Sequence, residues 1–292
     1  MTTAQPVALE TPVDFAGEAV AVSRASHRTR QTVRSFWALI ARELYILRCH
    51  VPSFLLQTGT QPLLFTLVFV YIMPSIGGEM RVGGTSFSSI LLPGMVANAT
   101  VLNSMVSVSM SMIRELSYNR SIEDRMLAPL PLWALGVQKI TWGALNGLIA
   151  GAVVFPIVYL VHARSQAPQV HVGNWPLFVS CIVLVPLLAA SIGLFIGTIL
   201  DPRQINLLIN LVVVPATLLG CVYYPWAALR PVPVIQYLVL IDPVVYASEA
   251  LRTVFTPAVP HMPVTVVLSV IAIALVGFLV VSLRAFQRRL IG

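Results

Sequence analysis

The chain has 292 residues, of which 57% are hydrophobic and only 10% are charged, and its formal net charge is +7. Ordinary globular domains carry about 25% charged residues, so this composition argues against a water-soluble domain and predicts a membrane protein. The basic balance does not indicate nucleic-acid binding, because the arginines flank apolar stretches and form no patch interleaved with aromatic residues.

Residues 1–31 precede the first apolar stretch and lack the apolar core of a signal peptide. We expect them to form a disordered cytoplasmic tail. Residues 32–50 place apolar side chains on one helical face at spacings of three and four: Val33, Phe36, Trp37, Ile40, Leu44 and Leu47. This pattern predicts an amphipathic helix along the inner membrane surface, as either a plain anchor or a contact with a partner.

Six long intervals of the chain contain no Asp, Glu, Lys or Arg. Each exceeds the roughly 20 residues that cross the hydrocarbon of a bilayer. A segment in lipid must satisfy its backbone hydrogen bonds internally, which favours helices. The sequence therefore predicts an all-α polytopic membrane protein with six transmembrane helices, at about 53–75, 88–111, 137–161, 175–199, 205–225 and 264–284.

The basic residues predict the orientation of these spans. If the N-terminus is inside, fourteen of the 18 basic residues are cytoplasmic: Arg24, Arg28, Arg30, Arg34, Arg42, Arg48, Arg114, Arg120, Arg125, Lys139, Arg203, Arg284, Arg288 and Arg289. The positive-inside rule then favours both termini in the cytoplasm.

Glycines recur in the third span at Gly143, Gly147 and Gly151, and in the fourth at Gly193 and Gly197. Small residues at this spacing let two helix backbones approach closely. We expect this close packing within one protomer, with a dimer seam as the alternative.

The stretch between spans five and six, residues 223–255, is too apolar for a solvated loop. Four prolines rule out one continuous helix: Pro225, Pro231, Pro233 and Pro243. We expect broken re-entrant helices that dip into the outer leaflet and form a constriction or exit, because irregular backbone at that depth must face protein or a watered cavity. Glu249 and Arg252, at i and i+3, are placed to pair with each other.

The sequence offers little support for catalysis in this chain. No GxSxG or HExxH motif occurs, and Lys139, the only lysine, belongs to no phosphate-binding loop. No acidic residue falls within a predicted span, which disfavours coupling to an ion gradient. An ATP-driven process would therefore need its ATPase in a separate chain.

A charged island interrupts the apolar pattern between spans two and three. Six of the twelve residues from 114 to 125 are ionisable: Arg114, Glu115, Arg120, Glu123, Asp124 and Arg125. Ser121 is able to cap a short surface helix there, with Glu123 and Asp124 at its positive end. The island is either a solvated connector or the contact through which a cytosolic motor acts.

Three motifs resemble a known family: SIEDRMLAPLP at 121–131, YYPWAAL at 223–229 and DPVVYASEALR at 242–252. From residue 32 to the sixth span, the chain resembles the permease subunits of ABC-2 type exporters, akin to daunorubicin-type drug-resistance permeases and nodulation lipo-oligosaccharide export permeases. The resemblance implies a six-helix ABC-2 type transmembrane domain over 51–292. Asp242 departs from the family pattern, which commonly has Asn before this proline.

The resemblance also implies roles for two groups of residues. The helix around 117–128 would couple to the ATPase through Arg120, Ser121, Glu123, Asp124 and Arg125. The outer re-entrant element would include Tyr223, Tyr224, Trp226, Asp242, Glu249 and Arg252.

The expected function is that of a permease subunit in an ATP-driven ABC exporter of the bacterial cytoplasmic membrane. It would move an amphiphilic substrate outward, such as a drug, a lipid or a lipid-linked glycan. The chain itself would bind no cofactor, and ATP and Mg would be bound by a partner ABC ATPase, alongside a second permease copy or paralogue. The alternative is an integral-membrane scaffold or assembly factor without its own transport path.

Overall fold

The computed structural model describes residues 33–76, 81–82, 85–117, 132–161, 172–204, 208–257 and 259–291. The expected N-terminal tail, 1–31, lies outside these ranges. So does the stretch 118–131, which contains most of the charged island.

The described chain is almost entirely helical. It begins with a helix over 33–49. There follow α2 (Val51–Thr66), the π-helix η1 (Leu67–Ile72), α3 (Met73–Ser75), the antiparallel strands β1 (Arg81–Val82) and β2 (Thr85–Ser86), α4 (Phe87–Ser117), α6 (Leu132–Leu160) and α7 (Trp175–Ile199). The last part comprises η2 (Pro202–Gln204), the π-helix η3 (Leu208–Val213), α9 (Val214–Leu219), η4 (Trp226–Leu229), α10 (Pro233–Leu238), η5 (Val239–Ile241), α11 (Pro243–Phe255) and α12 (Val264–Ile291).

Five helices in the described ranges are long and apolar enough to cross a membrane: Val51–Ser75, Phe87–Glu115, Trp133–Leu160, Trp175–Ile199 and Val264–Arg289. They coincide with five of the six predicted spans. The chain is therefore a multi-pass membrane protein, as its composition predicted.

The predicted fifth span, 205–225, ends earlier in the structure. Its described helical part consists of η3 and α9, six residues each, over 208–219. The helix ends at Gly220, and Cys221 takes a positive φ of 51° that turns the chain away. The described residues thus contain five candidate spans, or six if the bent pair below is counted as one.

That bent pair is the proline-rich stretch. Pro233–Ile241 and Pro243–Phe255 meet at an angle of 98°, as the prolines predicted. Asp242 is extended at the joint, with φ −82° and ψ 122°, because the ring of the following proline disfavours a helical conformation there. The Asp242 side chain accepts a hydrogen bond from the backbone N–H of Val244 and thereby caps α11.

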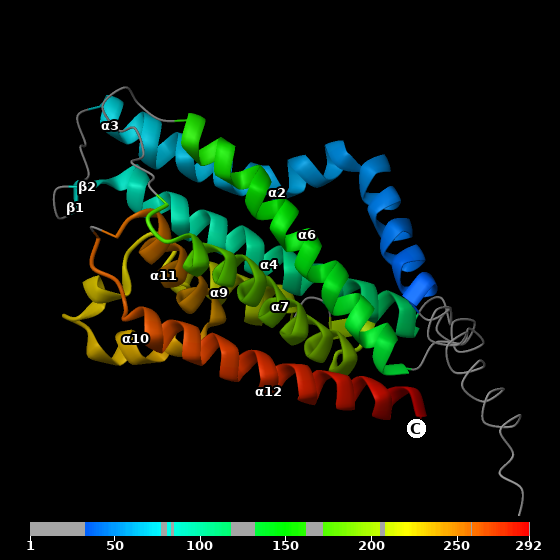
Figure 1. Ribbon diagram of the computed structural model, residues 1–292. Coiled ribbons are helices and arrows are strands. Elements are labelled where there is room, and N and C mark those ends of the chain that lie inside the picture. The colour runs from blue at the N-terminus through cyan, green and yellow to red at the C-terminus, as the bar shows by residue number, and fades with distance from the viewer. Residues whose placement is uncertain are drawn as a thin grey trace, which may run out of the picture.

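Helix α4 forms the centre of the bundle and packs against α6, α7 and α11 (Figure 1). Of its most apolar stretch, 78% is buried, against 11% in α12. The glycines of α6 permit a close contact with α4: a methyl group on Gly147 would come within 2.4 Å of the Thr100 carbonyl oxygen on α4. The predicted close packing within one protomer is therefore confirmed for α6.

The two ends of the bundle differ. The end of α4, the start of α6 and the C-terminus lie at one end, while β1, β2, α10 and α11 lie toward the other (Figure 1). The 33–49 helix lies at an angle to α2 and starts near the first of these ends. Its Ile40 is buried, whereas Trp37 and Tyr45 are exposed.

Candidate functional site

Glu249 and Arg252 form a fully buried ion pair on α11, as their spacing predicted. The guanidinium Nη1 lies 2.7 Å from Glu249 Oε1, and both side chains have 0% exposure. Removing two charges from water costs several kcal/mol per ion unless other polar groups complete the shell around them. The surrounding backbone supplies those groups.

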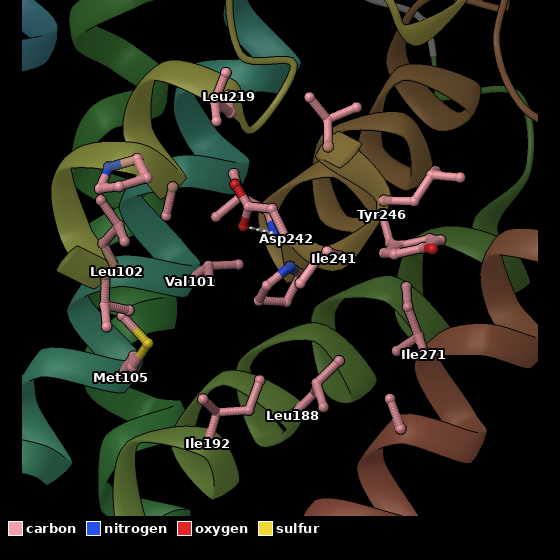
Figure 2. Close-up of a pocket in the computed structure, with 18 of the residues that line it drawn as sticks. Val101, Leu102, Met105, Leu188, Ile192, Leu219, Ile241, Asp242, Tyr246 and Ile271 are labelled. Carbon is pink, nitrogen blue, oxygen red and sulfur yellow. Dashed lines mark hydrogen bonds between the residues drawn. The ribbon is translucent and has the colours of Figure 1, made fainter. Parts of the chain in front are cut away.

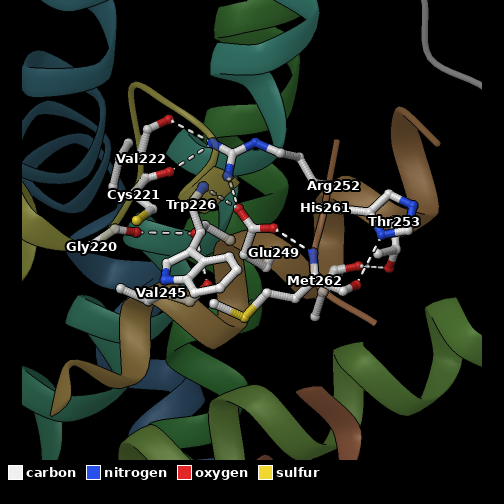
Figure 3. Close-up of polar contacts among 12 residues, drawn as sticks. Gly220, Cys221, Val222, Trp226, Val245, Glu249, Arg252, Thr253, His261 and Met262 are labelled. Carbon is white, nitrogen blue, oxygen red and sulfur yellow. Dashed lines mark hydrogen bonds and ion pairs between the residues drawn. The ribbon is translucent and has the colours of Figure 1, made fainter. Parts of the chain in front are cut away.

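The carboxylate of Glu249 accepts hydrogen bonds from the backbone N–H of Trp226 and of Met262, each at 3.0 Å. Arg252 Nη2 donates to the carbonyl oxygens of Cys221 at 2.6 Å and Val222 at 3.3 Å (Figure 3). We call these six residues the α11 node. It joins α11 to the turn after α9, to the start of η4 and to the segment that precedes α12.

The α11 node also accounts for the unusual backbone of Cys221. A positive φ is uncommon for a residue other than glycine and costs about 1–3 kcal/mol. The hydrogen bond from Arg252 to the Cys221 carbonyl holds this turn, and Ser248 donates to the neighbouring Gly220 carbonyl at 3.0 Å. The early end of the fifth helical segment is therefore stabilised by tertiary contacts from α11.

The predicted aromatic residues brace the same region. Trp226 Nε1 donates to the Gln236 carbonyl oxygen at 3.1 Å and so joins η4 to α10. Tyr223 stacks on Phe65 of α2 with ring centroids 4.9 Å apart, and the Tyr224 hydroxyl donates to the Leu218 carbonyl at 3.4 Å. Trp226, Glu249 and Arg252 therefore come together, while the two tyrosines point to other neighbours.

Asp242 stands apart from this node and lines a cavity of about 550 Å³. The walls come from α4, α7, η3, α9 and α12, and the α10–α11 joint completes them (Figure 2). Apart from Asp242 and Tyr246, the lining side chains are apolar. Its size falls within the range of about 300–1,000 Å³ that is usual for small-molecule sites.

A second, smaller cavity of about 380 Å³ lies between α4, α6, α7 and α11. Its described lining is apolar except for Thr100 and Cys181. No group of three or more His, Cys, Asp or Glu within the described ranges could hold a metal ion.

A polar cluster that the sequence analysis did not single out lies at the opposite end of the bundle. Lys139 is only 3% exposed, and its Nζ lies 2.5 Å from Glu115 Oε1, 2.8 Å from Ser111 Oγ and 3.9 Å from Glu43 Oε1. We call these four residues the Lys139 node. It joins the 33–49 helix to α4 and α6.

The only sequence signal for this node was the single lysine at the start of the third predicted span. The predicted coupling residues, Arg120, Ser121, Glu123, Asp124 and Arg125, lie outside the described residues. The helices that flank them, α4 and α6, are described. They supply three of the four residues of the Lys139 node: Ser111, Glu115 and Lys139.

Comparison with known proteins identifies the family. The family model for the ABC-2 type transporter matches residues 34–256. The chain is also 26% identical over 259 residues to the inner membrane transport permease YadH of Escherichia coli strain K12, across 88% of this chain and 94% of that protein. The YadH proteins of E. coli O157:H7 and Shigella flexneri match equally well. The chain therefore belongs to the ABC-2 type transporter family.

Proposed function

We propose that this chain is the permease subunit of an ATP-driven exporter in the bacterial inner membrane. The observation that carries the proposal is the 550 Å³ apolar cavity, which is built from four spanning or near-spanning segments and the bent α10–α11 pair. A membrane protein of the transporter family with such a cavity is suited to hold a substrate within the bilayer. The curated relatives, named as inner membrane transport permeases, support the location.

The chemistry of the cavity suggests an amphiphilic substrate. Apolar walls favour the apolar part of a ligand through loss of its contact with water. Asp242 and Tyr246 supply the few polar groups that would fix its orientation. A drug, a lipid or a lipid-linked glycan has this composition.

Energy for transport would come from a separate ABC ATPase that binds ATP and Mg. The printed sequence has no phosphate-binding loop, so the chain would receive the motion rather than generate it. The coupling contact would involve Arg120, Ser121, Glu123, Asp124 and Arg125, and the Lys139 node would carry the movement to α4, α6 and the 33–49 helix. A second permease copy or paralogue would complete the assembly.

The orientation of the chain determines which end of the cavity would be the exit in an exporter. With both termini in the cytoplasm, as the positive-inside rule favours, the α11 node and the bent pair lie toward the outer surface. The bent pair would then form the exit, with Tyr223, Tyr224 and Trp226 beside it, and the 33–49 helix would lie at the cytoplasmic face with its exposed aromatic residues in the headgroup region.

The test is reconstitution in inside-out vesicles with the P-loop ATPase that co-purifies with the chain. The permease alone should hydrolyse no ATP, and the complex should accumulate a fluorescent amphiphile only with ATP present. An assembled, ATP-hydrolysing complex that moves no amphiphile in either direction would contradict the proposal and favour a scaffold. ATP hydrolysis by the purified permease alone would contradict the proposal that a separate chain is the ATPase.

A further inference from the structure

We propose that Asp242 is a charge-selective contact in the 550 Å³ cavity, and that the cavity prefers amphiphiles bearing a protonated amine. The inference deepens the proposed function, on which it rests, by naming the chemical class of the ligand. It is carried by the position of one carboxylate in an otherwise apolar cavity (Figure 2).

The two oxygens of Asp242 have different surroundings. Oδ1 accepts the capping hydrogen bond from Val244 N–H at 2.9 Å. Oδ2 is buried and has no hydrogen-bond partner among the described residues. An ionised carboxylate oxygen in apolar surroundings is costly unless a donor or a cation approaches it. The site therefore has unused capacity for one positively charged or donating group.

Capping α11 does not require the charge. Asn and Asp are about equally good N-cap residues, because either side-chain oxygen accepts the same backbone N–H. A structural cap would be satisfied by Oδ1 alone. The second oxygen and its charge are therefore not needed for the cap, and a ligand group in the cavity would reach the closed-off Oδ2 through a small shift of the Asp242 side chain or its neighbours.

The rest of the cavity determines what accompanies the cation. Described residues that line it, such as Val101, Leu102, Leu188, Ile192 and Phe278, are aliphatic or aromatic and come from three helices. Such walls suit an alkyl chain or a ring system rather than a hydrated ion. The combination fits an ammonium group attached to an apolar body.

The experiment measures equilibrium binding of radiolabelled dodecylamine and of dodecanol to the full-length chain in phosphatidylcholine nanodiscs. The two probes share a chain and differ in charge at neutral pH. We expect wild type to bind the amine at least tenfold more tightly than the alcohol. Asp242→Asn keeps the cap and should weaken amine binding at least tenfold while changing alcohol binding less than twofold. Asp242→Glu, which keeps the charge, should retain part of the preference.

A matched pair on α12 locates the ligand. Ala274 lines the cavity, whereas Ala272 is exposed on the same helix and does not line it. Ala274→Phe should abolish binding of both probes, and Ala272→Phe should leave both unchanged. Phosphatidylethanolamine is then added to the discs to identify the source of the amine. If this lipid displaces dodecylamine, the site accepts the amine of a lipid headgroup, and if dodecylamine stays bound, the site prefers a free amphiphile. Either result supports an ammonium site.

Equal affinity of wild type for amine and alcohol would overturn the inference, as would unchanged amine binding in Asp242→Asn or in Ala274→Phe. Binding is measured without the ATPase, so this failure is distinct from failure of the proposed function. A chain that shows no amine preference but exports another amphiphile with ATP would lose only the present inference.

Discussion

The α11 node joins four segments and the Lys139 node joins three, each around one cation, but the two nodes are built differently. In the α11 node, the acid and base are three residues apart on one helix, both are fully buried, and backbone groups supply further hydrogen bonds to each of them. In the Lys139 node, the cation and its acids come from three helices, and Glu115 and Glu43 are 12% and 20% exposed. The first arrangement suits a fixed brace, and the second suits a joint whose parts separate at modest cost.

This contrast corresponds to the proposed division of the molecule. The α11 node holds the strained turn at Cys221 and the bent pair, which must keep their shape for the cavity to exist. The Lys139 node lies on the helices that flank the predicted coupling segment, where motion from an ATPase would arrive. Four variants test the comparison, beginning with the largest expected effect.

Arg252→Ala should break the α11 node and destabilise the chain most. It leaves the buried Glu249 carboxylate without its cation, a change that typically costs about 3–5 kcal/mol. Thermal unfolding of the full-length chain in detergent measures this. The matched control is Arg230→Ala, because Arg230 is exposed at the end of η4 and should change stability by about 0.5 kcal/mol or less. Equal effects of both variants would show that the node is no brace.

The double reversal Glu123→Lys, Asp124→Lys should release the ATPase or stop export. Truncating a buried, hydrogen-bonded charge at an interface costs about 2–5 kcal/mol, so pull-down affinity should fall at least tenfold. A solvated connector would lose about 0–1 kcal/mol and export nearly normally. The reversal Glu10→Lys, Asp14→Lys in the N-terminal tail is the control for added positive charge.

Lys139→Met should uncouple the end of the bundle that holds the Lys139 node from the end that holds the bent pair, without unfolding the chain. It keeps an unbranched apolar side chain that is one atom shorter, and it removes the ammonium group that joins Glu115, Ser111 and Glu43. We expect a loss of about 1–3 kcal/mol in stability, less than for Arg252→Ala because both acids retain some contact with solvent. ATP-dependent export should fall much further than stability.

Lys139→Arg serves as the control for that variant, because it restores the charge and should recover part of the export. If Lys139→Met destabilises the chain as strongly as Arg252→Ala, the two nodes are equivalent and the contrast drawn above is wrong.

Asp201→Asn should have the smallest effect. Arg289 Nη2 lies 3.1 Å from Asp201 Oδ1 at the ends of α12 and α7, and Asp201 is 64% exposed. An exposed pair of this kind is worth about 0–1 kcal/mol. Stability and export should both stay close to wild type, and a large loss of either would mean that surface charge at this end contributes more than its exposure indicates.

The sequence predicted the features that depend on local pattern. The long intervals without charged residues predicted five of the spans, and the prolines predicted the break at Asp242. The i, i+3 spacing predicted the ion pair of Glu249 with Arg252. Each of these follows from residues that lie close together in the chain.

Features that depend on distant residues were not predictable in the same way. The apolar pattern continues past Gly220, but contacts from Ser248 and Arg252 hold a turn there, so the fifth helical segment ends early. The Lys139 node joins residues from three helices, including Glu115, which is 24 positions away. The cavity exists only through the relative placement of several helices, and no single stretch of sequence encodes it.

Hydrogen–deuterium exchange on the assembled complex, with and without ATP, tests the contrast between the nodes most directly. Amide protection reports local opening. We expect the amides of Trp226 and Met262, which donate to Glu249, to stay protected in both states, while the 33–49 helix and the end of α4 change protection when ATP is added. Equal changes at both nodes, or an ATP response confined to the α11 node, would contradict the account.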